Sequence, residues 1–140
     1  MRRQSRGRLV DSFAYAFEGL RYCFLAERNV RIHLAIAVAV LALSLWLRIS
    51  VLEWALIIVA IALVFAGEML NTVVEMTVDL ITLEDRPLAK CAKDVAAGAI
   101  LVAAIAAAII GFLVLGPHLW HKLFGSSPIG NLFPASPLYS

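Results

Sequence analysis

The sequence has 140 residues, of which 62% are hydrophobic and only 16% are charged, and its mean hydropathy is +0.89. An average soluble chain is about half apolar and about a quarter charged, so this chain has too little polar material to cover a soluble globule. These values exclude a soluble enzyme domain, a nucleic-acid-binding module and a disordered chain, while the formal net charge of +2 is too small to indicate a partner.

The first predicted element is an amphipathic helix over about residues 8–26. We expect no cleavable signal peptide, because charged residues recur up to Arg31 without an uninterrupted apolar segment between them. One face of the helix is apolar and largely aromatic, and it carries Leu9, Phe13, Phe17, Leu20 and Phe24. This pattern is typical of a helix that lies in the lipid headgroup layer, although packing against a partner protein explains it equally well.

Three apolar segments follow, and we predict a membrane-spanning helix in each. A helix rises about 1.5 Å per residue, so about 20 residues are needed to cross a hydrocarbon core about 30 Å thick. The first span contains only His33 and Ser44 as polar residues beyond its first turn, and the third is uncharged from residue 95 to residue 116. The predicted spans are residues 28–47, 54–81 and 92–116. The short connection after the first span predicts an antiparallel hairpin.

The distribution of Lys and Arg predicts the orientation in the membrane. Seven of these residues precede the uncharged part of the first span, and three lie between the second span and the uncharged part of the third, which makes ten of the twelve. The positive-inside rule therefore places the N-terminus and the second loop in the cytoplasm and the C-terminus outside. Residues 125–140 are rich in Gly, Ser and Pro and are expected to be disordered, so a single membrane domain covers residues 1–124.

The second span carries a polar stripe formed by Glu68, Asn71, Glu75 and Asp79. Spacings of three, four and four residues place these side chains on one helix face. Each carboxylate costs on the order of 2.5 to 3.5 kcal/mol to insert into a bilayer, so a compensating cation or proton is required. The oxygen-only set suits a hard cation such as Mg²⁺. The alternative is that these residues are protonated or salt-bridged and hold helices together.

Basic residues lie at the same end of the predicted bundle as the stripe. Lys93 and Asp94 begin the third span, and Glu27 and Arg31 begin the first. Carboxylates that bind Mg²⁺ beside cations that contact phosphate oxygens are the components that phosphoryl transfer needs. The sequence has no Walker A, glycine-rich kinase loop or HRD motif, so a kinase of this sequence belongs to neither the P-loop nor the protein-kinase class.

The sequence resembles the prokaryotic diacylglycerol kinase family, which includes undecaprenol kinases. The resemblance covers about residues 8–116 and is carried by FAYAFEGLRY (13–22), ERNVRIHL (27–34), EMLNTVVEMTVDL (68–80) and PLAKCAKDVAAGAIL (87–101). It implies an all-α integral membrane fold with a surface helix and three transmembrane helices. It also implies a homotrimer with composite active sites near the cytoplasmic membrane surface, where MgATP phosphorylates a lipid alcohol.

The resemblance implies a role for each polar residue. Glu68 would be the general base toward the lipid hydroxyl, and Glu27 and Glu75 would be the Mg²⁺ ligands. Asn71 would position the phosphate or the substrate, and Lys93 would neutralise the transferring phosphoryl group. Asp94 would hold the side chain of Lys93.

Further residues are implied on the nucleotide side. These are Asp79, Glu84, Arg8, Tyr15 and Arg31. The sequence departs from the family pattern at Asp11, where relatives often carry a lysine, and at Asp85-Arg86, which replaces a usual Tyr-His pair. Nucleotide contacts from these two places are left open.

The sequence is therefore interpreted as an inner-membrane lipid kinase that transfers the γ-phosphoryl group of MgATP to a lipid alcohol. The segments ERNVRIHL and PLAK resemble the undecaprenol-kinase branch of the family more than its diacylglycerol branch, which implies undecaprenol as the preferred lipid. Expected partners are ATP, the lipid alcohol, membrane lipids and further copies of the chain, without nucleic acid. The alternatives are a small ion-coupled transporter or channel that uses Glu68, Glu75 and Asp79, and a non-catalytic scaffold. A transporter needs a polar route across the bilayer, which residues 54–67 and the third span do not offer.

Overall fold

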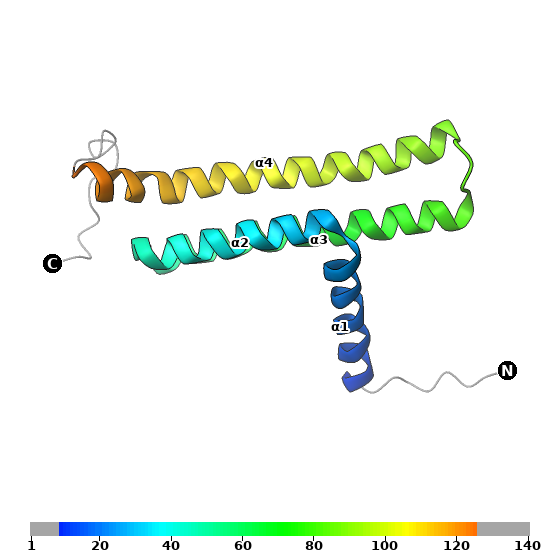
Figure 1. The fold of residues 1–140 in the computed structure, drawn as a ribbon, viewed down its shortest axis with the longest axis horizontal. Coiled ribbons are helices and arrows are strands. Elements are labelled where there is room, and N and C mark those ends of the chain that lie inside the picture. The colour runs from blue at the N-terminus through cyan, green and yellow to red at the C-terminus, as the bar shows by residue number, and fades with distance from the viewer. Residues whose placement is uncertain (1–8, 126–140) are drawn as a thin grey trace.

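The computed structural model describes residues 9–125, and these residues form four α-helices without a β-strand. The helices are α1 (Leu9–Ala26), α2 (Arg28–Leu47), α3 (Val51–Ile81) and α4 (Pro87–Phe124). Figure 1 shows α2, α3 and α4 side by side as a long bundle, while α1 leaves the bundle at a steep angle. The all-helical prediction is confirmed, whereas Arg8 and the expected tail after residue 125 lie outside the described residues.

The turn between α2 and α3 is fixed by local hydrogen bonds. Arg48 ends α2 in the left-handed conformation, with φ of 55° and its N–H donated to the carbonyl of Leu45. Ser50 and Glu53 then form a capping box, in which the Ser50 N–H donates to Glu53 Oε2 at 2.7 Å and Ser50 Oγ accepts from the Glu53 N–H at 3.4 Å. Helix α3 thus begins at Val51, directly after the turn, and runs antiparallel to α2.

The second hairpin joins α3 to α4, and these two helices share the most extensive contact in the chain. Pro87 opens α4 at a position where its missing N–H costs no helical hydrogen bond. Gly67 lies against α4, and a Cβ built on it would lie 3.8 Å from the Cα of Ile100 and 4.0 Å from the Cβ of Ala103. Small residues on both helices therefore allow a close approach, as is common between helices in membranes.

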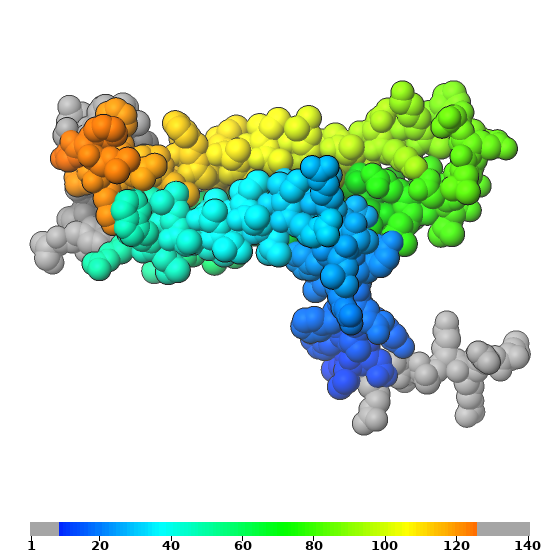
Figure 2. Space-filling model, in the orientation of Figure 1, coloured from blue at the N-terminus to red at the C-terminus, as the bar shows by residue number. Residues whose placement is uncertain are grey.

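Helices α2, α3 and α4 are each long and apolar enough to cross a membrane. The core of the described chain lies near the turn between α2 and α3 and contains Leu47, Ile49, Ile57, Val114 and Leu115. Only 22%, 28% and 17% of the most apolar windows of these three helices are buried. Most of the apolar surface, part of which is visible in Figure 2, therefore needs lipid or another protein chain to cover it.

Helix α1 buries only Cys23 and exposes aromatic side chains along most of its length. Phe13 is 67% exposed and Phe17 is 70% exposed. At the other end of the helix, the ring of Phe24 packs against that of Phe65 on α3, with a centroid distance of 5.8 Å. This contact ties the end of α1 to the bundle and leaves its earlier turns uncovered.

Candidate active site

The residues of the polar stripe of α3 make two contacts with neighbouring helices and one contact within α3. Glu68 faces His33 of α2, Asn71 bonds Glu75 one turn along α3, and Asp79 faces Lys93 of α4. The spacing predicted from the sequence is therefore matched by a line of polar contacts along the bundle. These contacts lead from a buried carboxylate toward an exposed ion pair.

The buried member of the line is Glu68, which is 4% exposed. His33 Nε2 lies 3.0 Å from Glu68 Oε1, and the His33 side chain is 24% exposed. Sequence reasoning did not assign His33 to the site. The available signal was a titratable residue inside an otherwise apolar span, which in a membrane protein is by default a candidate functional residue.

Asn71 has a buried oxygen atom that lacks a partner. Its Nδ2 donates to Glu75 Oε1 at 2.8 Å, so its Oδ1 points elsewhere, and no hydrogen bond reaches this buried atom within the described residues. Buried amide groups almost always have hydrogen-bond partners, so this oxygen is expected to accept a hydrogen bond or to bind a cation. Glu75 and Asn71 together offer the hard oxygen ligands that Mg²⁺ prefers, and they fit such an ion chemically.

The second expected Mg²⁺ ligand, Glu27, lies at the N-cap of α2. It precedes His33 by six residues, and Glu75 follows Glu68 by seven, which correspond to about 9 Å and about 10.5 Å along the two antiparallel helices. Glu27 and Glu75 therefore lie at nearly the same level of the bundle. Within residues 9–125 no three His, Cys, Asp or Glu side chains gather closely enough to hold a metal ion.

The ion pair between Lys93 and Asp79 corrects one expectation. Lys93 Nζ lies 2.6 Å from Asp79 Oδ1, so Asp79, and not Asp94, holds the ammonium group in this structure. Successive residues of a helix point about 100° apart, which directs Asp94 away from the side chain of Lys93. Asp79 is reached instead because the end of α3 lies beside the second turn of α4.

A polar cavity of about 640 Å³ surrounds this ion pair at the junction of α3 and α4. Its lining includes Asp79, Glu84, Lys93 and Asp94, so four residues predicted for catalysis or nucleotide binding come together here. Arg86 also lines the cavity and forms an ion pair with Glu84 at 2.8 Å. The cavity thus carries both carboxylates and cations.

Two further predicted nucleotide residues are not brought into this cavity. Tyr15 lies on α1, which projects from the bundle, and it is 71% exposed. Arg31 is an exposed residue of α2. Neither is among the residues that line the polar cavity, so one copy of the described chain does not join them to it.

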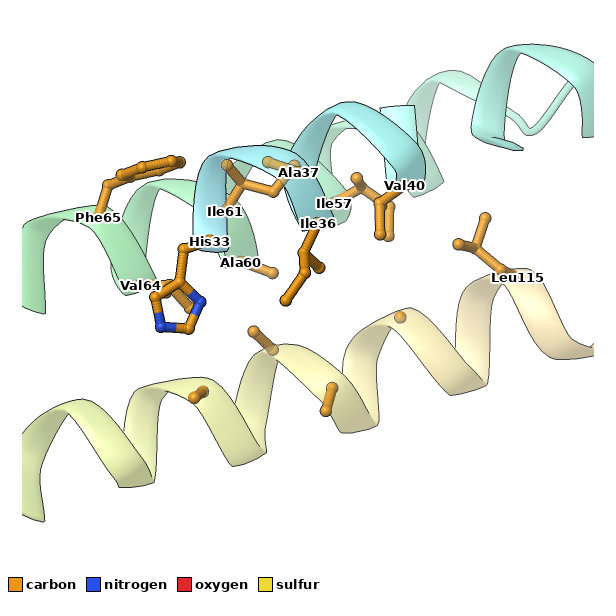
Figure 3. Close-up of a pocket in the computed structure, with 14 residues that line it drawn as sticks. His33, Ile36, Ala37, Val40, Ile57, Ala60, Ile61, Val64, Phe65 and Leu115 are labelled. Atoms are coloured by element: carbon orange, nitrogen blue, oxygen red, sulfur yellow. The ribbon is translucent and has the colours of Figure 1, made fainter. Parts of the chain in front are cut away.

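An apolar cavity of about 390 Å³ lies among α2, α3 and α4 on the other side of Glu68. Figure 3 shows His33 pointing from α2 into this space, toward α4. His33 is the only polar side chain among the residues that line it, and alanines, Gly111 and Leu115 form the α4 wall. The His33–Glu68 pair therefore lies where an apolar cavity meets the polar stripe.

Comparisons with known proteins point to one family. Residues 14–115 match the family model described as Prokaryotic diacylglycerol kinase. The chain is 44% identical over 117 residues to the undecaprenol kinase of Bacillus subtilis (strain 168), covering 84% of this chain and 95% of the relative. It is 44% identical over 112 residues to the diacylglycerol kinase of Synechocystis sp., covering 79% of this chain and 64% of the relative. The diacylglycerol kinase of Escherichia coli (strain K12) is 30% identical over 111 residues, with coverages of 79% and 91%.

Proposed function

The chain belongs to the prokaryotic diacylglycerol kinase family, and on that basis we propose that it transfers the γ-phosphoryl group of ATP to the hydroxyl of a membrane lipid alcohol. The observation that carries the proposal is the position of Glu68. Its buried carboxylate lies between an apolar cavity, which suits a hydrocarbon chain, and a polar stripe that leads to Lys93. The preferred acceptor is undecaprenol, with diacylglycerol as the competing lipid.

The proposed site works at the cytoplasmic face of the bacterial inner membrane. The junction of α3 and α4 carries Arg86, Lys90 and Lys93, and the positive-inside rule assigns such a loop to the cytoplasm. ATP is present on that side. In this orientation α1 rests on the cytoplasmic membrane surface with its exposed aromatic side chains in the headgroup layer.

The proposed assembly is a homotrimer whose active sites are shared between copies. Two observations support it. The apolar windows of the spans are at most 28% buried, and Glu27, Tyr15 and Arg31 line neither the polar nor the apolar cavity of the described residues. A neighbouring copy covers apolar surface and brings its own polar residues to the shared site. Alanines and Gly98 on the uncovered side of α4 suit close contact between helices.

In the proposed reaction, Glu68 takes the proton of the lipid hydroxyl while the lipid oxygen attacks the γ-phosphorus. The new O–P bond forms, the bond to the β-phosphate oxygen breaks, and ADP leaves. Lys93, held by Asp79, neutralises charge on the transferring phosphoryl oxygens. Glu75, Asn71 and Glu27 would hold Mg²⁺, which supplies charge neutralisation on the β- and γ-phosphate oxygens when bound.

The transporter alternative is not supported by the cavity between α2, α3 and α4. A route for protons or cations needs polar groups along its length, and this cavity has His33 alone. Its remaining lining is made of aliphatic and aromatic side chains and one glycine. A hydrocarbon chain fits such a lining better than a hydrated ion does.

The direct test is a lipid kinase assay with the purified protein in mixed micelles. Undecaprenol, diacylglycerol and ceramide are each incubated with γ-labelled MgATP, and labelled lipid is separated by thin-layer chromatography. We expect labelled undecaprenyl phosphate, lost in Glu68→Gln and retained in Glu53→Gln, which changes a glutamate at the opposite end of α3. If the folded wild-type protein labels none of the three lipids, the proposal is wrong.

A further inference from the structure

We propose that His33 is a positioning residue for Glu68, and that its ion-pair contact with one carboxylate oxygen aims the other oxygen at the lipid hydroxyl. This inference rests on the proposed function, because it assigns Glu68 the role of general base. His33 Nε2 on α2 lies 3.0 Å from Glu68 Oε1 on α3, so the contact connects two different helices inside the bundle.

The contact between His33 and Glu68 is an ion pair, and chemistry limits how its proton is placed. An ionised carboxylate has acceptor oxygens only, so a favourable contact requires Nε2 of the imidazole to carry a proton. The Nε2–H group of His33 therefore faces Oε1 in the state in which Glu68 is ready to accept a proton. Within the described residues, no other hydrogen bond or ion pair reaches either side chain.

The second oxygen, Oε2, is the one left for substrate. No hydrogen bond within residues 9–125 engages it, while Oε1 is occupied by His33. A carboxylate fixed at one oxygen presents the other in a defined direction, which is what a base needs in order to meet a hydroxyl at hydrogen-bond distance. His33 thus selects which oxygen of Glu68 accepts the proton.

The location of His33 gives the second reason. It is the only polar side chain that lines the apolar cavity, and its ring points into that space in Figure 3. A carboxylate that faced hydrocarbon without a partner would carry a large desolvation cost. His33 lines the cavity and Glu68 does not, so His33 is the polar partner that Glu68 has on the side of the apolar cavity.

In the proposed step, the proton of the lipid hydroxyl moves to Glu68, and His33 neither gains nor loses a proton. The O–H bond of the lipid alcohol breaks, its proton goes to Oε2 of Glu68, and its electron pair forms the bond to the γ-phosphorus. The bond from the γ-phosphorus to the β-phosphate oxygen breaks, and ADP leaves with that electron pair. His33 keeps its Nε2 proton and its contact with Oε1 throughout. Loss of His33 therefore affects the rate of transfer and leaves the binding of ATP unaffected.

The test compares three replacements of His33 in the lipid kinase assay. Leucine removes the donor, glutamine places an amide N–H near the position of Nε2, and asparagine is too short to reach Glu68. We expect His33→Leu and His33→Asn to lower kcat on the order of 10- to 100-fold with an unchanged KM for ATP, because misplacement of a catalytic group by about 1 Å has an effect of this size. His33→Gln should restore kcat to within about threefold of wild type.

The matched control is His118→Leu. His118 Nε2 lies 3.6 Å from Glu53 Oε2, so the same replacement is made in another His–Glu pair, at the other end of α3. This variant should keep the wild-type kcat. A purely structural role for His33 predicts loss of thermal stability in His33→Leu and equal turnover of the folded Gln and Asn variants, and equal turnover would overturn the inference.

A double substitution shows whether His33 acts through Glu68. In the Glu68→Gln background, adding His33→Leu should change the residual kcat by less than about threefold, because the base it positions is already gone. A full further loss, equal to that of His33→Leu alone, contradicts the inference.

The two proposals fail in different ways. If wild type is active, Glu68→Gln is inactive and every His33 variant turns over normally, only the role of His33 is wrong. If wild type phosphorylates no lipid, the proposed function is wrong and the role of His33 is lost with it.

Discussion

Lys93 Nζ lies 2.6 Å from Asp79 Oδ1, and this salt bridge joins the second turn of α4 to the last turn of α3. The two side chains are 38% and 47% exposed, so the pair is solvated and contributes little to stability. Its importance lies in placement, because Asp79 fixes the ammonium group at the edge of the polar cavity. A positive charge that is already held in position needs little rearrangement when it stabilises a transferring phosphoryl group.

The first prediction follows from that placement. Lys93→Met should lower kcat by at least about 100-fold, the scale for loss of one group that stabilises a transition state. The thermal unfolding midpoint should change little, because the salt bridge is half-exposed. Steady-state kinetics and a thermal scan of the same preparation check both points, with Lys122→Met at the far end of α4 as the control. Turnover near that of wild type would remove Lys93 from the reaction.

The second prediction concerns Mg²⁺ and Glu75. Glu75→Gln keeps an oxygen that accepts from Asn71 Nδ2 but removes the charge, so the Mg²⁺ concentration at half-maximal activity should rise at least about tenfold. Glu27→Gln should act in the same direction, because Glu27 lies at the same level of the bundle. Titration of activity with Mg²⁺ at fixed ATP measures both, and Glu53→Gln serves as the control. An unchanged titration curve excludes that glutamate from the metal site.

The third prediction separates the base from a ligand at Glu68. Glutamine can still hydrogen-bond His33 but cannot take a proton, so Glu68→Gln should lower kcat by at least about 100-fold with little change in the KM for ATP. Initial rates over a range of ATP concentrations give both constants. If instead the KM rose and turnover at saturation survived, Glu68 would be a nucleotide or metal ligand.

The fourth prediction concerns orientation. In a background with Cys23→Ala and Cys91→Ala, a membrane-impermeant maleimide added to intact cells should label Ser50→Cys and spare Asp85→Cys. Ser50 lies in the turn between α2 and α3, and Asp85 lies in the loop between α3 and α4, at the opposite end of the bundle. Both variants should be labelled after permeabilisation. External labelling of Asp85→Cys would reverse the topology and separate the site from cytoplasmic ATP.

Local signals in the sequence were sufficient for the helices and for the stripe. Three apolar segments of spanning length predicted the bundle, and spacings of three and four residues placed Glu68, Asn71 and Glu75 on one face, from which the Asn71–Glu75 bond follows directly. The apolar pattern does not fix where each helix begins, because local capping groups also determine the first residue. Helix α3 begins at Val51, and not near residue 54, because the Ser50–Glu53 capping box starts it immediately after the turn.

Contacts between helices were beyond the reach of pattern reasoning. The pairing of His33 with Glu68 depends on the register of α2 against α3, which the position of the turn and the packing of side chains set together. The family resemblance implied that Asp94 holds Lys93, although the α3–α4 register brings Asp79 to this lysine. Residues far apart in the chain meet only when that register is known.

The sparse burial of α2, α3 and α4 has a practical consequence for biochemistry. With no more than 28% of any span window covered, surfactant molecules and, in the proposed trimer, neighbouring copies compete for the same uncovered surface. Specific activity in micelles should then depend on the molar ratio of detergent to enzyme, and dilution at constant detergent should reduce it more than proportionally. Rates from different laboratories become comparable only when that ratio is stated with them.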